Sequence, residues 1–100
     1  EQKKWRFVLI IIFSPIFTTY ILHSKQLDKF YIGYTAENVQ VRLSIHLANH
    51  KGFTAKAKDW EIVYQEIFTT KQDPMKREKQ IKGWKSNIRI KELIDRNSTE

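Results

Sequence analysis

The sequence predicts an α+β fold in which helices flank a small three-stranded antiparallel sheet. Two β-prone runs are separated by a short polar stretch, which is typical of an antiparallel hairpin. Apolar residues then recur at helical spacing, and a third β-prone run precedes two further helical segments. Together these observations give the order β-β-α-β-α-α.

The hairpin is predicted from two runs joined by a polar stretch that begins at Lys25. In FTTYILHS, residues 17–24, Tyr20 and Ile21 fall on opposite faces of the strand. In KFYIGYT, residues 29–35, two tyrosines surround Gly33, and a glycine inside a strand often marks a bulge or a close approach of backbone. We therefore expect either a plain hairpin strand or one whose tyrosine faces a partner.

A helix is predicted over residues 37–50, ENVQVRLSIHLANH, because apolar residues recur there at every fourth position. The apolar stripe consists of Val39, Leu43 and Leu47. Arg42 and His46 are also four apart, so a cation and an imidazole lie side by side on the rim of this stripe. The composition of residues 51–59 predicts a loop, and residues 60–69, WEIVYQEIFT, predict the third strand.

Two helical segments complete the predicted domain. The first begins at Asp73-Pro74, with aspartate as the cap and proline in the first helical position. Its apolar side consists of Ile81, Trp84 and Ile88. Glu78 lies on the rim of that side, about 60° around the helix from Ile81. A break near Ser86-Asn87 precedes the closing helix, whose apolar residues are Ile90, Leu93 and Ile94.

The charge of the chain is distributed unevenly. Residues 71–96 hold nine Lys/Arg against four Asp/Glu, whereas residues 17–70 hold six against five. This asymmetry indicates a polyanion as partner, with nucleic acid ahead of a membrane surface. The alternative is a solvated basic helix face that only keeps the protein in solution. The absence of cysteine excludes disulfides and thiolate metal sites and favours a cytoplasmic location.

Residues 1–16 resemble the basic and apolar regions of a signal peptide, because three basic residues precede an apolar run. The run is shorter than the roughly 20 residues that a spanning helix needs, and Pro15 interrupts it. A short membrane anchor, an additional buried segment and an upstream extension all stay open. We expect residues 1–16 to be an extension outside the domain. The domain then covers residues 17–96, and residues 97–100 form a tail.

Five residues are candidates for chemistry, since the chain has no Gly-rich phosphate loop, no Cys/His cluster and no Ser-His-Asp pattern. They are Tyr20, Tyr31, Arg42, His46 and Glu78. Each also has a structural explanation when taken singly. A strand tyrosine is usually a packing residue, Arg42 and His46 can extend over the core, and Glu78 can pair with Lys82 one turn later.

The order of these residues resembles the GIY-YIG nuclease superfamily, in particular its small stand-alone bacterial members and the amino-terminal domain of the excision-repair protein UvrC. The resemblance spans residues 17–96. The YIG element is Tyr31-Ile32-Gly33, and the GIY element is kept only as Thr18-Thr19-Tyr20. Gly33 is then expected to leave room for nucleic acid or for neighbouring backbone.

The resemblance implies a DNA endonuclease, acting in DNA repair or recombination, that uses a single Mg²⁺ or Mn²⁺ ion and no small-molecule cofactor. Glu78 matches the metal-binding glutamate of the family, Arg42 its helix arginine and His46 a frequent companion histidine. Tyr31 would be the general base, Tyr20 would orient it or the water, and His46 would position phosphate or relay a proton. Asn87 is the nearest candidate for a late family asparagine. The alternative is a nucleic-acid-binding module of the same fold without turnover.

The basic carboxy-terminal segments supply the expected contacts to DNA backbone phosphates. The residues are Lys76, Arg77, Lys79, Lys82, Lys85, Arg89 and Lys91. A third hypothesis is a membrane-surface protein that uses the apolar leader and these basic helices.

A phenol has an ordinary pKa near 10, so a tyrosine base needs positive charge beside it at neutral pH.

Overall fold

The computed structural model describes residues 16–98, and its elements follow the predicted order β-β-α-β-α-α. The strands are β1 (Phe17–Ser24), β2 (Lys29–Thr35) and β3 (Glu61–Phe68). The helices are α2 (Val39–Ala48), α3 (Gln72–Trp84) and α4 (Asn87–Ser98), with a 3₁₀ helix, η1 (Phe53–Lys56), in the predicted loop. The predicted α+β class with a three-stranded antiparallel sheet is confirmed.

The extension predicted over residues 1–16 lies outside the described residues except for Ile16. The domain limits at residues 17 and 96 therefore stay a prediction. Over the part of the chain from residue 16 to residue 98, no helix has both the length and the apolar character needed to cross a bilayer.

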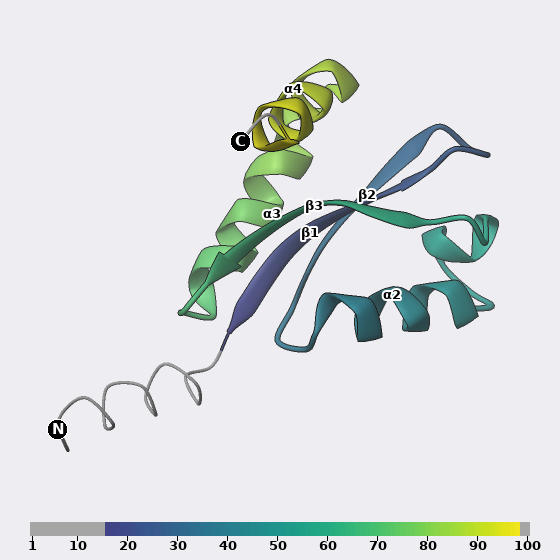
Figure 1. Cartoon of the computed structure of the whole chain (residues 1–100), viewed down its shortest axis with the longest axis horizontal. Helices are drawn as coiled ribbons and strands as arrows, with labels where there is room; N and C mark the ends of the chain where they lie inside the picture. Colours follow the sequence, from purple (N-terminus) through teal and green to yellow (C-terminus); the bar gives the residue numbers. More distant parts are fainter. Residues whose placement is uncertain (1–15, 99–100) are drawn as a thin grey trace, which may run out of the picture.

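The central strand of the sheet is β1, because the strand order is β2-β1-β3 and both neighbours run antiparallel to it. One face of the sheet is covered by α2 and the other by α3 and α4 (Figure 1). The strand β1 thus lies between two helical layers, which explains why its residues are buried at nearly every position.

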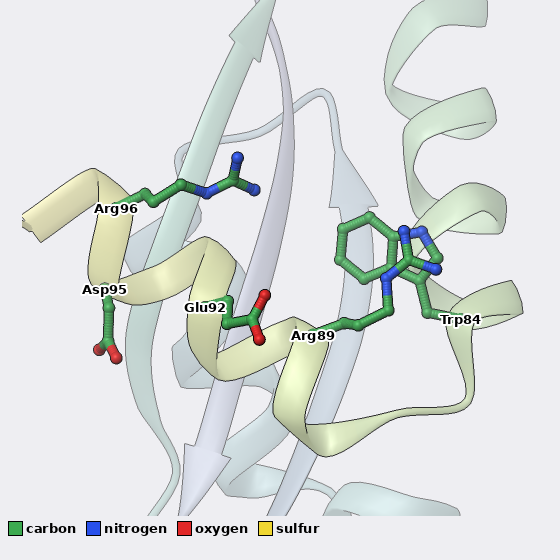
Figure 2. Close-up of a pocket in the computed structure, with 5 residues that line it drawn as sticks. All are labelled: Trp84, Arg89, Glu92, Asp95 and Arg96. Atoms are coloured by element: carbon green, nitrogen blue, oxygen red, sulfur yellow. The ribbon is translucent and has the colours of Figure 1, made fainter.

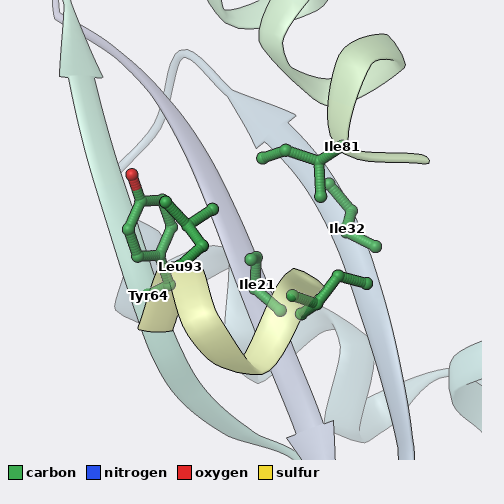
Figure 3. Close-up of a cluster of buried hydrophobic side chains, with 6 residues drawn as sticks. Ile21, Ile32, Tyr64, Ile81 and Leu93 are labelled. Atoms are coloured by element: carbon green, nitrogen blue, oxygen red, sulfur yellow. The ribbon is translucent and has the colours of Figure 1, made fainter. Parts of the chain in front are cut away.

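Each face of the sheet has its own core. The core beneath α3 and α4 consists of Ile21, Ile32, Tyr64, Ile81, Ile90 and Leu93 (Figure 3). The core beneath α2 consists of Tyr20, Leu22, Val39, Ala57 and Trp60. Tyr20 and Ile21 contribute to different cores, so their predicted placement on opposite faces of β1 is confirmed.

The start of α3 and the position of Ile88 differ from the sequence prediction. The helix begins at Gln72, and Asp73 lies inside its first turn, where the carboxylate accepts a hydrogen bond of 2.8 Å from the Thr70 hydroxyl. The helix ends at Trp84, and the capping residue Lys85 adopts a left-handed conformation with φ 49°. Because this break changes the direction of the chain, Ile88 belongs to α4 and is 71% exposed.

The space above Gly33 is filled by the Tyr20 ring. The two residues lie directly opposite each other in the β1–β2 ladder. A Cβ atom on Gly33 would be 2.6 Å from the Tyr20 hydroxyl oxygen and 2.7 Å from its Cζ atom. The glycine therefore makes room for a neighbouring side chain, and the expectation that this room serves backbone or nucleic acid is wrong.

We predict that Gly33→Ala lowers the free energy of unfolding by about 1–3 kcal/mol, because the added methyl group displaces a fully buried ring. Gly83→Ala is the matched control, since a Cβ atom there meets nothing within 4 Å. Within α3 the control should raise the free energy of unfolding by about 0.5–1 kcal/mol. Urea unfolding measures both, and equal stability of the two variants would contradict the prediction.

Candidate active site

Four of the five candidate residues come together from three elements, and Glu78 on a fourth element acts on Tyr20 electrostatically. Tyr20 lies on β1, Tyr31 on β2, Arg42 and His46 on α2, and Glu78 on α3. The Tyr20 hydroxyl is 2.8 Å from His46 Nε2, and the ring centroids of Tyr31 and His46 are 4.7 Å apart. The tyrosine rings lie 6.4 Å from each other, measured between centroids. Side chains widely separated in the sequence thus share one location.

His46 is buried within the site, whereas the helical pattern predicts it on a rim. Its exposed fraction is 3%, and its two ring nitrogens bind Tyr20 on one side and Thr54 Oγ1, at 3.0 Å, on the other. Asn49 Nδ2 donates a second hydrogen bond, of 3.2 Å, to the Thr54 hydroxyl oxygen. A fully hydrogen-bonded imidazole at this depth does not itself face solvent.

Thr54 is the site residue that sequence reasoning missed. It is buried on η1, and its carbonyl accepts a hydrogen bond of 2.9 Å from the Trp60 indole. The composition of residues 51–59 indicates only a loop, and hides the short helix that follows Gly52. The available signal is Gly52 itself, whose φ of 87° turns the chain into η1.

Burial sets the protonation states at the centre of the site. It raises the pKa of Tyr20 to about 12, although hydrogen bonding by the Arg42 guanidinium opposes the rise. Electrostatic interactions with the neighbouring Tyr31 and Glu78 side chains raise the pKa of Tyr20 further. Burial also lowers the pKa of His46, and the charge of Arg42 lowers it further. At neutral pH the site therefore contains a phenol and a neutral imidazole.

The neutral state of His46 constrains its two hydrogen bonds. A neutral imidazole carries one N–H, so His46 donates one of the bonds to Tyr20 and Thr54 and accepts the other. Tyr20, His46 and Thr54 thus form one buried hydrogen-bonded chain.

Glu78 is the candidate metal ligand, and it forms an ion pair in the structure. Its carboxylate is 2.9 Å from Lys82 Nζ one turn later, and its side chain is 17% exposed. Residues 16–98 contain no group of three or more acidic or histidine side chains arranged around a common point. A single carboxylate nevertheless fits Mg²⁺, which keeps several waters and often takes only one or two protein carboxylates.

The remaining predicted residues are divided between exposed and engaged side chains. Asn87 is exposed at the first position of α4. Arg77 Nε is 3.1 Å from a Glu66 carboxylate oxygen, and the Arg89 guanidinium lies 4.6 Å from the centroid of the Trp84 ring. Besides the half-buried Arg77, the cations of the set all have exposed side chains: Lys76, Lys79, Lys82, Lys85, Arg89 and Lys91. The contacts of these residues to nucleic acid stay a prediction.

A pocket of about 470 Å³ lies between the end of α3 and α4, away from the five candidate residues. Figure 2 shows that the Arg89 side chain, which lines this pocket, extends across the Trp84 ring. The other lining residues are Glu92, Asp95 and Arg96. Two arginines and two carboxylates thus line it together, so the pocket has no net charge that would select an anion or a cation.

Comparison with known proteins gives two matches and one negative finding. The sequence model of a family described as "GIY-YIG catalytic domain" matches residues 16–91. A UPF0213 protein of Staphylococcus haemolyticus (strain JCSC1435) is 35% identical over 79 residues, which are 77% of this chain and 93% of that protein. No solved structure matches the chain significantly.

We predict that His46 makes the stability of the fold depend on pH. Its pKa in the folded state lies below the ordinary 6.5, so the unfolded chain binds the proton first as the pH falls. The contribution of His46 to stability is therefore complete above about pH 6.5 and decreases below it. Between about pH 7.5 and about pH 5, the Tm of the wild type should fall more than that of His46→Gln.

Thermal unfolding followed by circular dichroism measures this difference. At neutral pH, His46→Gln should itself lower stability by about 1–3 kcal/mol, because Tyr20 and Thr54 lose a buried partner. The exposed His50 provides the control, and His50→Gln should keep the pH dependence of the wild type. Identical slopes for wild type and His46→Gln would refute the assignment.

Proposed function

The chain belongs to the GIY-YIG catalytic domain family, and on this basis we propose that it is a Mg²⁺-dependent DNA endonuclease acting in DNA repair or recombination. The family is a nuclease superfamily, for which DNA is the implied substrate. The observation that carries the proposal is the gathering of two tyrosines, an arginine and a histidine from three elements, with a glutamate of α3 that acts on Tyr20 electrostatically. Their order in the sequence is the order that the family uses.

Phosphodiester hydrolysis makes three demands on a protein site. A water oxygen attacks phosphorus and loses a proton, negative charge develops on the phosphate oxygens, and the bond to the 3′ oxygen breaks. The departing oxygen takes a proton from solvent. The five residues supply a base, a fixed cation and a metal-binding carboxylate, which together meet these demands.

The two tyrosines take different parts in this proposal. Tyr20 is 1% exposed with a pKa of about 12, so it stays protonated and acts as a positioning residue through His46. Tyr31 is only half-buried, and it faces the same side of the sheet as Tyr20. We therefore assign to Tyr31 the removal of the proton from the attacking water.

Arg42 and His46 contribute charge and order. The Arg42 guanidinium is partly exposed beside Tyr20, where its planar donors suit a scissile phosphate. The burial of His46 argues against direct contact with phosphate. His46 is thus better suited to hold Tyr20 in place than to carry a proton.

Glu78 would hold the divalent ion, in keeping with the general use of divalent metals by GIY-YIG nucleases. When bound, Mg²⁺ supplies Lewis-acid stabilisation of charge on the phosphate and on the departing oxygen. In the structure the Glu78 carboxylate forms an ion pair of 2.9 Å with Lys82, whose side chain is 51% exposed. Because this ion pair is half-exposed and therefore weak, Lys82 would not prevent Glu78 from holding a divalent ion.

The Glu78–Lys82 ion pair also favours a second candidate function, a nucleic-acid-binding module of the same fold without turnover. In that case the lysine neutralises the carboxylate permanently, and the basic helices bind DNA in a salt-dependent way. Metal-dependent product formation separates the two functions.

We expect Mg²⁺-dependent cleavage of branched, flapped or single-stranded DNA that EDTA abolishes. Tyr31→Phe should reduce the rate about 100-fold or more, because it removes the base. Glu78→Gln should abolish the stimulation by Mg²⁺, because an amide binds the ion weakly. Gel analysis of end-labelled DNA at a series of Mg²⁺ concentrations measures both effects.

Matched controls come from the same strand and from a neighbouring helix. Tyr34→Phe changes a tyrosine of β2 on the opposite face, and Glu92→Gln changes an exposed glutamate of α4. Both controls should cleave like the wild type. Absence of cleavage by the wild type, or full activity of both Tyr31→Phe and Glu78→Gln, would reject the nuclease.

We further expect Lys82→Gln to lower the Mg²⁺ concentration needed for half-maximal cleavage by about twofold, since the lost ion pair no longer competes for Glu78. The measurement uses saturating DNA, so that a change in DNA affinity does not contribute. Lys71→Gln, at the start of α3, is the control and should leave the Mg²⁺ dependence unchanged. A higher Mg²⁺ requirement in Lys82→Gln would contradict the competition.

A further inference from the structure

We propose that Phe53, Lys29 and Lys56 form a subsite that takes an unpaired nucleobase and its flanking phosphates. This Phe53 subsite lies beside Tyr31, and its assignment rests on the proposed nuclease function. It defines the class of substrate more narrowly, as nucleic acid that is single-stranded next to the reaction centre. No residue of the subsite belongs to the five candidate catalytic residues or to the predicted basic set.

The Phe53 ring continues the aromatic surface of the candidate site. Its centroid is 6.2 Å from that of Tyr31, and the two ring planes are inclined by only 23°. The Trp60 ring supports it at 5.7 Å, and the Phe53 side chain as a whole is half-buried. The nearly parallel rings of Tyr31 and Phe53 thus form one aromatic surface that reaches from β2 to η1.

The loop that carries Phe53 is fixed to the rest of the fold. Thr54, its immediate neighbour, is bound by His46 and by Trp60. At the end of the loop, the Asp59 carboxylate accepts hydrogen bonds from the Ser24 hydroxyl, at 2.5 Å, and from the backbone N–H of residue 26, at 2.8 Å. The ring position is therefore preorganised, and a ligand need not order the loop.

Two lysines approach the Phe53 ring. Lys56 Nζ is 5.3 Å and Lys29 Nζ is 6.0 Å from the ring centroid. Both side chains are exposed, and within residues 16–98 neither takes part in an ion pair with a carboxylate. Lys29 precedes Tyr31 by two positions on β2, so both side chains leave the same face of the sheet. Two unneutralised cations therefore lie over the Phe53 ring. Because both side chains are exposed, a stacking base can displace their ammonium groups toward its own flanking phosphates.

This combination suits an unpaired nucleotide better than duplex DNA. A base can stack on Phe53 only when its face is free, and in a duplex both faces are covered by neighbouring base pairs. The ammonium groups bind phosphates as mobile point charges and carry no sequence information. Such a site holds one strand beside Tyr31 without reading its sequence, as expected for a subsite next to a cleaved phosphate.

The test measures binding in EDTA, so that no cleavage occurs. Fluorescence anisotropy of a labelled twelve-residue oligothymidylate at low salt gives the Kd, and a second oligonucleotide carries central abasic sites. Phe53→Leu should weaken binding of the intact strand about tenfold and leave the abasic strand nearly unchanged. Phe53→Tyr should retain the wild-type affinity, because it keeps an aromatic face.

Two controls separate the subsite from general effects. Phe30→Leu changes another half-buried phenylalanine, which contacts His23 and the core beneath α3 and α4, and should not alter the Kd. Lys56→Gln should reduce the slope of log K against log salt by about 0.7, and Lys71→Gln should reduce it less. Circular dichroism shows whether each variant is folded.

A measurement on the wild type alone guards against a misfolded Phe53→Leu. An oligonucleotide with 2-aminopurine should lose fluorescence on binding when its base stacks on an aromatic ring. Unchanged emission, equal effects of Phe53→Leu and Phe30→Leu, or equal losses on intact and abasic strands would overturn the subsite. Base-dependent binding without Mg²⁺-dependent cleavage would instead retain the subsite and reject the nuclease. Mg²⁺-dependent cleavage at the same rate in the wild type and in Phe53→Leu would retain the nuclease and reject the subsite.

Discussion

The candidate site depends on one contact, the passage of the Tyr20 ring across the backbone of Gly33. Because β1 is the central strand, a tyrosine on it reaches the edge of the sheet only by lying over its neighbour β2. A side chain at position 33 would push the Tyr20 ring away from the sheet and separate the Tyr20 hydroxyl from His46. His46 in turn fixes Thr54, and with it η1. One missing Cβ atom thus determines how a strand, a helix and a loop meet.

The site combines a neutral interior with a charged rim. Tyr20 and His46 are deeply buried and uncharged, and among the described residues no buried side-chain polar atom lacks a hydrogen-bond partner. The ionised groups Arg42 and Glu78 stay partly exposed, where desolvation costs less. This division keeps the hydrogen-bonded centre rigid, while the charges around it remain free to exchange water, counter-ions or phosphate.

The sequence predicted the elements well because their patterns are local. Alternation placed Tyr20 and Ile21 on opposite faces of β1, and the order of six elements was correct. The burial of His46 was not predictable, because it results from contact with a tyrosine 26 positions away and with a threonine in an apparent loop. The predicted place of Ile88 on the apolar side of α3 is wrong, since no sequence pattern locates the left-handed Lys85 that separates α3 from α4.

The position of Glu78 on α3 has a consequence for how the site comes apart. Tyr20 and Tyr31 lie on one hairpin, whose strands pair through a short turn, and such local pairing closes at little entropic cost. The acidic residue arrives only after β3 has crossed back to the far side of β1 and the chain has turned into α3. A partial unfolding that releases α3 and α4 would therefore remove the Glu78 carboxylate from the site and leave Tyr20 and Tyr31 in place on the hairpin. In that case the two halves of the site would form separate units of hydrogen exchange, and the amides of the hairpin would stay protected longer than those around Glu78.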